Sequence, residues 1–222
     1  NLKTPDPSLA QVILVFLQYR SPQLLLTIAS LCIGLRIWLG HFSYWDLAVI
    51  APALLLQPFV EWLIHVFVLH FRPRSLFGLR LDLHAARKHR AHHRSPWQLD
   101  YVFIPIRTGF IGLAILAAMF YLAMPSLELF LTGLSWGVLM ALSYEWIHYL
   151  IHTSYRPRTP FYRRRWKIHR LHHFKNEHFW MGVTGHLGDQ VLGTLPSRPT
   201  EVVTSKTCRT LGVDDDESSS PG

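Results

Sequence analysis

The sequence is poor in cysteine, and this excludes two kinds of architecture. Among its 222 residues, only Cys32 and Cys208 are cysteines. One lies in an apolar run and the other in a polar segment, so they cannot build a disulfide framework or a cysteine zinc motif. Any metal site in this chain is therefore expected to use other ligands. No cleavable signal peptide is visible either.

Charged residues are also scarce, because they make up 16% of the chain while hydrophobic residues make up 50%. The apolar residues gather in long runs, which is typical of membrane-spanning helices. A net charge of +8 is compatible with nucleic acid or membrane binding. The apolar runs favour an anionic membrane surface, and we expect no nucleic-acid partner.

Four apolar runs are each long enough to cross a bilayer as a helix. They cover residues 23–40, 46–70, 103–123 and 127–151. Ser21 and Pro22 predict the N-cap and first position of the first helix. Arg36 lies inside that helix and requires a partner or a position near the membrane surface. The sequence therefore predicts an all-α integral membrane protein with about four transmembrane helices.

The ends of the chain differ from this membrane domain, which we assign to residues 21–195. Residues 1–20 predict a lead-in with a short apolar segment lying at the membrane interface. Residues 196–222 are polar and finish in an acidic stretch followed by serines. Such a composition predicts a disordered tail that belongs neither to the core nor to a site.

Histidine is abundant, with 14 residues, and it forms a short phrase that occurs twice. His-Arg-Ala-His-His at residues 89–93 returns as His-Arg-Leu-His-His at residues 169–173. In a helix, positions i, i+3 and i+4 share one face, so the three imidazoles of each phrase can point the same way. Neutral imidazole is a good ligand for zinc, iron and copper. Each phrase is therefore a candidate metal site.

The repetition extends upstream, because a pair of histidines at the end of an apolar run precedes each phrase. Taken in chain order, these histidines predict two half-sites and two metal ions. The first half-site contains His65, His70, His89, His92 and His93, and the second contains His148, His152, His169, His172 and His173. His65 and His70 are five residues apart, so we expect the helix to end or bulge between them.

Basic residues orient the predicted helices in the membrane. The short loops near residues 40–46 and 124–128 contain no Lys or Arg, whereas residues 71–102 and 153–180 are rich in both. The positive-inside rule places these two long segments on the cytosolic side. All ten histidines are then expected in one layer at the cytosolic face. The membrane is the endoplasmic reticulum if the source is eukaryotic and the inner membrane if it is bacterial.

Four further residues are candidates for supporting the ligands. Glu61 and Glu145 precede histidines by four and three residues, and each could accept the second N–H of an imidazole and fix its tautomer. A hydrogen bond to another helix is the alternative role for both. Asn176 and His178 follow the second phrase and are candidates for ligand support or substrate positioning. No catalytic side chain beyond the metal ligands is expected.

Several kinds of chemistry remain open for such a site. A nitrogen-rich centre for two metals suits structural zinc or redox-active iron. Hydroxylation or desaturation of an unactivated C–H bond requires an oxidant that no side chain supplies. A metal transporter or metal-binding membrane protein is disfavoured, because the ligands gather at one face and not along a pathway. A zinc hydrolase is disfavoured because it needs an open ligand position and a general base.

The order and spacing of these histidines resemble those of the fatty acid hydroxylase/sterol desaturase superfamily, and are most similar to its fatty acid 2-hydroxylase branch. The resemblance covers residues 65–194 and rests on His65-x4-His70, His89-x2-His92-His93, His148-x3-His152 and His169-x2-His172-His173. It implies a four-helix membrane core, the ten histidines as ligands, and two metal ions. Iron is the expected metal, and zinc can occupy such sites in isolated protein.

The resemblance also implies O₂-dependent oxidation of a lipid drawn from the bilayer. Because no cytochrome b5-like domain is visible in this sequence, an external donor of the cytochrome b5 or ferredoxin/reductase type is expected. The expected function is a membrane-bound non-haem dimetal monooxygenase that hydroxylates the acyl chain of a fatty acid or sphingolipid. A sterol or carotenoid hydroxylase or desaturase of the same superfamily is the alternative.

Overall fold

Helices form most of the part of the chain that the structure, a computed structural model, describes, which is residues 6–213. Short loops join them, and a single hairpin supplies the two strands found in these residues. The helices are α1 (Leu9–Phe16), α2 (Arg20–Leu39), α3 (Tyr44–Ile64), α4 (His84–Arg94), α5 (Ile106–Ala123), α6 (Leu127–Ile151), α7 (Pro160–Phe174) and α8 (Leu187–Val191). The remaining elements are a π-helical turn (His65–Leu69), strands β1 (Arg74–Leu76) and β2 (Leu79–Leu81), and 3₁₀ turns at Leu99–Tyr101 and Pro199–Glu201.

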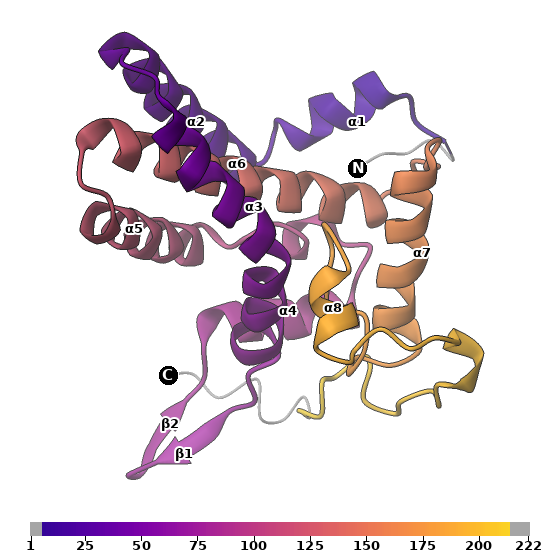
Figure 1. Cartoon of the computed structure of the whole chain (residues 1–222). Helices are drawn as coiled ribbons and strands as arrows, with labels where there is room; N and C mark the ends of the chain where they lie inside the picture. Colours follow the sequence, from indigo (N-terminus) through magenta and orange to yellow (C-terminus); the bar gives the residue numbers. More distant parts are fainter. Residues whose placement is uncertain (1–5, 214–222) are drawn as a thin grey trace.

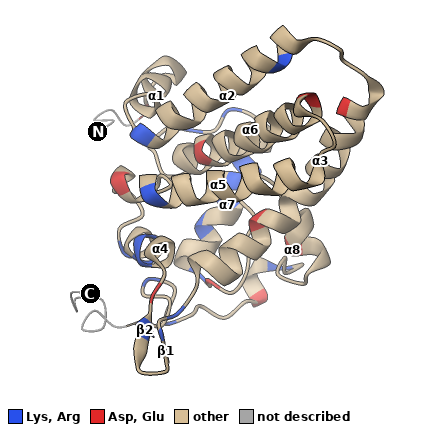
Figure 2. Cartoon of the chain, turned by 90° about the vertical axis from the view of Figure 1, so that its left-hand side faces the viewer, with Lys and Arg blue, Asp and Glu red and all other residues tan. Residues whose placement is uncertain are grey.

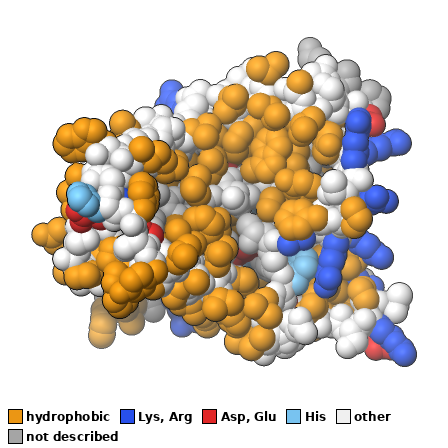
Figure 3. Space-filling view, turned by 45° about the horizontal axis from the view of Figure 1, so that its top comes forward, with side chains coloured by type: hydrophobic (Ala, Val, Ile, Leu, Met, Phe, Trp, Pro, Cys, Tyr) orange, Lys and Arg blue, Asp and Glu red, His pale blue; other side chains and the backbone are white. Residues whose placement is uncertain are grey.

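Four segments are long and apolar enough to cross a membrane, as the sequence predicted. They are Arg20–Leu39, Tyr44–Leu69, Leu99–Ala123 and Leu127–Ile151. Large apolar side chains point outward from them, including Trp38, whose exposed fraction is 79%. Apolar side chains also cover most of the face in Figure 3, and Lys and Arg gather along one margin. Such a surface is expected for a bundle that faces lipid.

Helix α6 is the centre of the bundle. Leu131, Leu134 and Val138 on α6 pack against Leu25 and Ala29 of α2. The other side of α6 carries glycines at positions 133 and 137, where a Cβ would overlap ring atoms of Phe120 or lie 2.7 Å from a methyl of Leu116, both on α5. The small residues therefore allow α5 to approach closely.

The buried arginine of α2 has found partners within the bundle. Arg36 forms an ion pair with Asp46 of α3, with Nη2 and Oδ1 2.7 Å apart, and its Nε donates to Thr132 of α6. Thr132 also donates to Asp46. This polar cluster of Arg36, Asp46 and Thr132 thus links three helices at the end of the bundle opposite to the histidines. Its hydrogen bonds offset the cost of burying the charge of Arg36.

The polar segments collect at the other end of the bundle. Figure 1 shows α4, α7 and α8 beyond the ends of α3 and α6, while the loops after α2 and α5 lie on the far side. Helix α1 lies beside this end, and Tyr149 of α6 donates to the carbonyl of Val12. Viewed from the side, few charges interrupt α2, α3, α5 and α6 (Figure 2). The arrangement leaves one polar layer under an apolar bundle.

Two local predictions were wrong at the start of α2. The helix begins at Arg20 with Tyr19 as its N-cap residue, so Ser21 is not the cap and Pro22 is the third helical residue. Pro22 is tolerated there because the first N–H groups of a helix have no intrahelical acceptor. The hydroxyl of Ser21 instead donates to Glu145 of α6, over 2.6 Å.

The predicted tail is ordered from residue 196 to residue 213. Cys208, Leu211 and Val213 are buried. The N–H of Ser205 donates to the carbonyl of Lys175 at the end of α7, over 2.7 Å. The expectation of disorder from residue 196 onward therefore fails for residues 196–213, because three apolar side chains anchor the segment. The acidic stretch that completed that prediction lies outside the described residues.

Candidate metal centre

Both histidine phrases are helical, and their helices meet below the bundle. Helix α4 carries the first phrase and α7 the second, while the paired histidines upstream lie at the ends of α3 and α6. The expected irregularity after His65 is a π-helical turn, in which the N–H of His70 donates to the carbonyl of His65 over 2.9 Å. One extra residue in the turn brings both rings toward the same place.

The ten histidines form two groups of five. In each group one ring nitrogen from every residue lies within 4.8 Å of the others. The His65 group contains His65, His70, His89, His93 and His172. The His148 group contains His92, His148, His152, His169 and His173.

The predicted half-sites in chain order were wrong in one respect, because the two phrases exchange their middle imidazole. His92 joins the second group and His172 joins the first. The reason is helical geometry, since residues four apart differ by about 40° around the axis while adjacent residues differ by about 100°. His89 and His93 therefore point together, and His92 points elsewhere. In α7, His169 and His173 likewise point together, and His172 points in a different direction.

The exchange places the two groups side by side. The rings of His93 and His173 belong to different groups, and their centroids are 4.2 Å apart. His93 and His172 share a group with centroids 5.0 Å apart. Two ions held in these groups would therefore be close neighbours. This is the arrangement that a dinuclear centre requires.

Four imidazoles are oriented by backbone carbonyls. The Nδ1 of His65 donates to the carbonyl of Met181 over 2.6 Å, and that of His148 donates to Val102 over 3.0 Å. Two further bonds of 2.8 Å run from His93 to Cys208 and from His172 to Phe179. A carbonyl only accepts, so each bond places the proton on Nδ1 and leaves the lone pair on Nε2 for a metal.

The nitrogens that face inward fit a metal and have no other satisfactory partner. In the described part of the chain, Nε2 of His93, His148 and His172 is buried without a hydrogen bond. Elsewhere imidazole nitrogens approach each other directly, and Nε2 of His169 lies 3.0 Å from Nε2 of His173. Buried polar atoms normally have partners, so converging lone pairs of this kind indicate cation sites.

Burial also keeps these imidazoles neutral. It lowers the pKa of His93 and His172 to about 3, and their bonds to carbonyls offset only part of this effect. Burial likewise holds the pKa of His89, His169 and His173 well below the ordinary value. A neutral imidazole has a free lone pair, so the groups are ready to bind metal at neutral pH.

The two glutamates predicted to contact imidazoles have other partners. Glu61 accepts from the N–H groups of Val183 and Thr184, and Glu145 accepts from the N–H of Ile104 over 2.8 Å. Each carboxylate therefore holds a backbone segment in place. In each segment, the carbonyl two residues before a bound N–H accepts the hydrogen bond that orients an imidazole. These acceptors are Met181, two residues before Val183, and Val102, two before Ile104.

The other two predicted supporting residues lie away from the imidazoles. Asn176 accepts from the N–H of His178 and donates to the carbonyl of Val203, which ties α7 to the C-terminal segment. The side chain of His178 is 61% exposed and lies 3.4 Å from Glu177. Neither residue contacts the two groups through a hydrogen bond that would orient a ligand.

Sequence reasoning missed the buried acid that shapes the loop before α8. Asp189 accepts from the N–H groups of Met181 and Gly182 and from the hydroxyl of Thr194. Burial alone would raise its pKa, but these bonds and His186 lower it below the ordinary value. At Gly182 a Cβ would overlap the carbonyl oxygen of Gly185. The sequence signal for this loop was the pair Gly182 and Asp189, which are seven residues apart.

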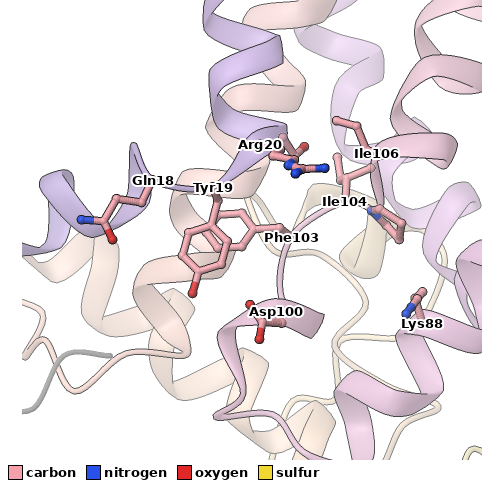
Figure 4. A pocket seen from close by; sticks show the side chains of 10 residues that line it. Gln18, Tyr19, Arg20, Lys88, Asp100, Phe103, Ile104 and Ile106 are labelled. Carbon is pink, nitrogen blue, oxygen red and sulfur yellow. The ribbon is translucent and has the colours of Figure 1, made fainter.

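One cavity in the described residues lies next to this centre but outside it. It holds about 480 Å³ and is lined by the α1–α2 junction, α4 and the segment before α5. Figure 4 shows Arg20, Lys88 and Asp100 around it with the rings of Tyr19 and Phe103. None of the ten histidines lines it. The segment at residues 102–104 separates the cavity from His148.

The fold and the site define a class of membrane protein, an apolar four-helix bundle with a paired polyhistidine centre at one end. A sequence profile of the fatty acid hydroxylase family matches residues 50–194. The chain belongs to this family, which confirms the resemblance seen in the histidine spacing.

Relatives of known function agree with this assignment. The dihydroceramide fatty acyl 2-hydroxylase FAH1 of Arabidopsis thaliana is 27% identical over 79% of this chain and 72% of its own length. The ceramide very long chain fatty acid hydroxylase SCS7 of Saccharomyces cerevisiae is 33% identical over 61% of this chain, but the match covers only 34% of SCS7.

A solved structure shares the fold. The structure of full-length scs7p, in which only the hydroxylase domain is visible, superimposes with a TM-score of 0.68. The match covers 83% of this chain and 68% of that chain at 23% identity. At 23% identity this similarity shows a shared fold and nothing further.

Proposed function

We propose that this chain is a membrane-bound non-haem dimetal oxygenase that hydroxylates the acyl chain of a lipid. One observation carries the proposal: two adjoining groups of five imidazoles, all buried except the half-buried His70, lie at the end of an apolar bundle. Family membership supports the same reaction class. In this proposal all ten histidines of the two groups are metal ligands, five for each ion.

Iron is the proposed metal in both groups. Neutral imidazole donors accept iron as well as zinc, so the donor set permits either. Bound iron would supply the O₂-dependent oxidising chemistry that an unactivated C–H bond requires and that side chains lack. The chain contributes oriented imidazoles and a shell without bulk water. Zinc in isolated protein would occupy the same nitrogens.

The proposed substrate is an acyl chain of a fatty acid or sphingolipid. The plant relative is a dihydroceramide fatty acyl 2-hydroxylase, and the yeast relative is a ceramide very long chain fatty acid hydroxylase. The apolar outer faces of α2, α3 and α5 let a lipid approach from the bilayer without crossing water. The polar layer below the bundle would then hold the end of the chain near the imidazoles.

Electrons are proposed to come from a separate donor of the cytochrome b5 or ferredoxin/reductase type. The exposed basic residues around α7, including Arg163 and Arg164, offer an electrostatic surface for an acidic partner. Positive charge beside the histidine layer also supports a cytosolic location of the centre. We propose a multi-pass protein of the endoplasmic reticulum or, in a bacterium, of the inner membrane.

A metal transporter fits the geometry less well. Both histidine groups lie at one end of the bundle, and the opposite end carries the polar cluster of Arg36, Asp46 and Thr132. A transport pathway needs ligands or polar groups along the membrane depth. The paired groups at one depth instead suit a fixed centre.

A lipid mass profile tests the proposed function. Cells that express the chain would be compared with cells that express His172→Ala or the matched control His178→Ala, at equal protein level. One added oxygen atom on one lipid class, present with the wild type and His178→Ala but absent with His172→Ala, is the expected result. Loss of two hydrogens would change the assignment to desaturase. Unchanged lipids, with both metals bound and a reductase supplied, would reject lipid oxidation.

A further inference from the structure

The hairpin between α3 and α4 has an unusual turn. Strands β1 and β2 pair in an antiparallel register with Leu76 opposite Leu79, so Phe77 and Gly78 form a two-residue turn. Both have positive φ values, 51° and 79°. This is a region that Asn and Gly occupy readily and a bulky aromatic residue occupies at a cost. Turn geometry therefore does not explain why phenylalanine stands there.

The tip of this hairpin is apolar and almost completely uncovered. Phe77 is 95% exposed and Leu79 is 75% exposed, and Leu76 and Leu81 are exposed as well. A lone two-stranded hairpin has little stability in water, and four neighbouring exposed apolar side chains add an unfavourable hydrated surface. The hairpin therefore needs an apolar medium to cover its tip.

The position of the hairpin identifies that medium. A membrane span ends at Leu69, and β1 begins at Arg74, so the tip is attached by a few residues to the membrane surface. Phe77 is the eighth residue after Leu69, and an extended chain of eight residues reaches no farther than about 30 Å. The hairpin projects outside the outline of the helices in Figures 1 and 2. A bilayer that surrounds the bundle would continue past it.

The charge of the hairpin matches an anionic surface. Arg72 and Arg74 precede the apolar tip along the chain, and residues 71–81 contain no Asp or Glu. Arginines beside an inserted apolar group are the pattern of segments that lie in the interface of anionic membranes. The nearest acid along the chain, Asp82, is buried in a salt bridge.

That salt bridge joins the hairpin to the metal centre. Arg90 is 1% exposed, and its Nη2 donates to both carboxylate oxygens of Asp82 over 2.8 Å. Its Nη1 donates to the carbonyl of Phe71 over 3.0 Å. These two contacts hold both ends of the hairpin. Arg90 lies between His89 and His92 in the first phrase, so the base of the hairpin and the ligand-bearing helix α4 form one unit.

We propose that the tip of the hairpin, residues 76–79, inserts into the interfacial region of an anionic bilayer while its arginines contact lipid phosphates. Through Arg90 it acts as a membrane anchor for α4. This contact lies outside the four membrane-spanning segments. The proposal depends on the membrane location of the bundle and not on the reaction performed.

Site-directed spin labelling of the full chain in lipid nanodiscs tests the insertion. A nitroxide at Phe77→Cys would be compared with one at Val203→Cys, a position that is 80% exposed in the C-terminal segment. Cys32 and Cys208 are buried, and the unmutated chain gives their background labelling. We expect the Phe77 label to collide mainly with O₂, which is enriched in lipid, and the Val203 label with an aqueous nickel chelate. Equal accessibility of both labels to the chelate would overturn the proposal.

The lipid composition tests the role of charge. With the Phe77 label, we expect deeper insertion in nanodiscs that contain phosphatidylglycerol than in nanodiscs of phosphatidylcholine alone. Replacing Arg72 and Arg74 with Gln should remove this difference. Identical depth in both lipids would overturn the anionic contact. A label that the bilayer leaves exposed but an acidic electron-transfer protein covers would overturn the membrane assignment in favour of a protein partner.

Discussion

The two histidine groups use the same donor atoms but are held by different parts of the chain. In the His65 group three imidazoles donate to the carbonyls of Phe179, Met181 and Cys208, all downstream of the second phrase. In the His148 group one imidazole donates to a carbonyl, that of Val102, which directly follows the 3₁₀ turn before α5. The remaining contacts there are between imidazoles, such as His152 with His169 at 3.1 Å.

The difference shows how far regular helices can build a metal site. Helices α4, α6 and α7 deliver five imidazoles of the His148 group to one point with little further help. The His65 group contains one imidazole that follows an irregular turn, that of His70, and one imidazole from α7, that of His172. Loops after α7 therefore complete its orientation. Helical periodicity places a ring, while a second hydrogen bond sets its rotation.

The largest expected effect tests the assignment of His92 to the His148 group and of His172 to the His65 group. Removing two ligands of one group, with His65→Ala/His172→Ala, should leave about one bound ion per chain, because one group keeps only three imidazoles. Removing one ligand from each group, with His148→Ala/His172→Ala, should leave about two weakened sites. Metal content after dialysis against a metal buffer distinguishes these cases. The reverse result would restore the half-sites in chain order.

A smaller change tests the loop that supports the His65 group. Gly182→Ala should displace the carbonyl of Met181, because the new Cβ would overlap Gly185 and lie 2.9 Å from Asp189. We expect metal affinity of the His65 group to fall about 10- to 100-fold, as when a ligand loses its orienting partner. Chelator competition measures both sites. Gly185→Ala is the matched control, since nothing lies within 4 Å of its Cβ position. Equal loss at both groups would contradict separate support.

The C-terminal segment should have a weaker influence on the same group. Leu211→Asp places a charge at a buried position and should loosen the segment that presents the carbonyl of Cys208 to His93. We expect about a tenfold loss of affinity at the His65 group and none at the His148 group. The same chelator competition measures it. Val203→Asp, at an exposed position, should leave both sites unchanged. An unchanged Leu211→Asp variant would show that the segment has no orienting role.

The smallest expected effect concerns the support of the His148 group. Ser21→Ala removes one hydrogen bond to Glu145, but the N–H of Ile104 still binds that carboxylate. Unfolding free energy should fall by about 1–2 kcal/mol, with metal affinity retained. Thermal unfolding in detergent with metal titration checks this outcome. Ser30→Ala, on an exposed part of the same helix, is the control. A large loss of metal would mean that Ser21 is essential for placing Val102.

The sequence predicted the bundle and the gathering of ten histidines because both depend on local patterns. Apolar length located four spans, and the last of them, Leu127–Ile151, has the predicted bounds. The five-residue separation of His65 and His70 correctly predicted an irregular helix end. The spacing within each phrase also allowed His92 and His172 to join the opposite group, since adjacent helical residues point in different directions. Using that geometry requires knowing how α4 and α7 face each other.

Other features had no readable signal in the sequence. Any residue can present a backbone carbonyl, so Met181, Phe179 and Cys208 could not be identified as acceptors for imidazoles. Polar composition suggested disorder after residue 196, although a few buried side chains fasten residues 205–213 to α7. The hairpin was hidden in a basic segment because its strands are only three residues long each.

By itself the sequence determined that there are four apolar spans and that ten histidines follow two of them, in pairs at the span ends and in two helical phrases beyond, since hydrophobic length and helical spacing are properties of the local chain. Only the tertiary structure decided which five share a site and what orients them. That choice depends on the angle at which α4 meets α7 and on loops that approach from more than 100 residues away, as Cys208 approaches His93. Contacts between distant segments are set by packing, and local periodicity carries no record of them.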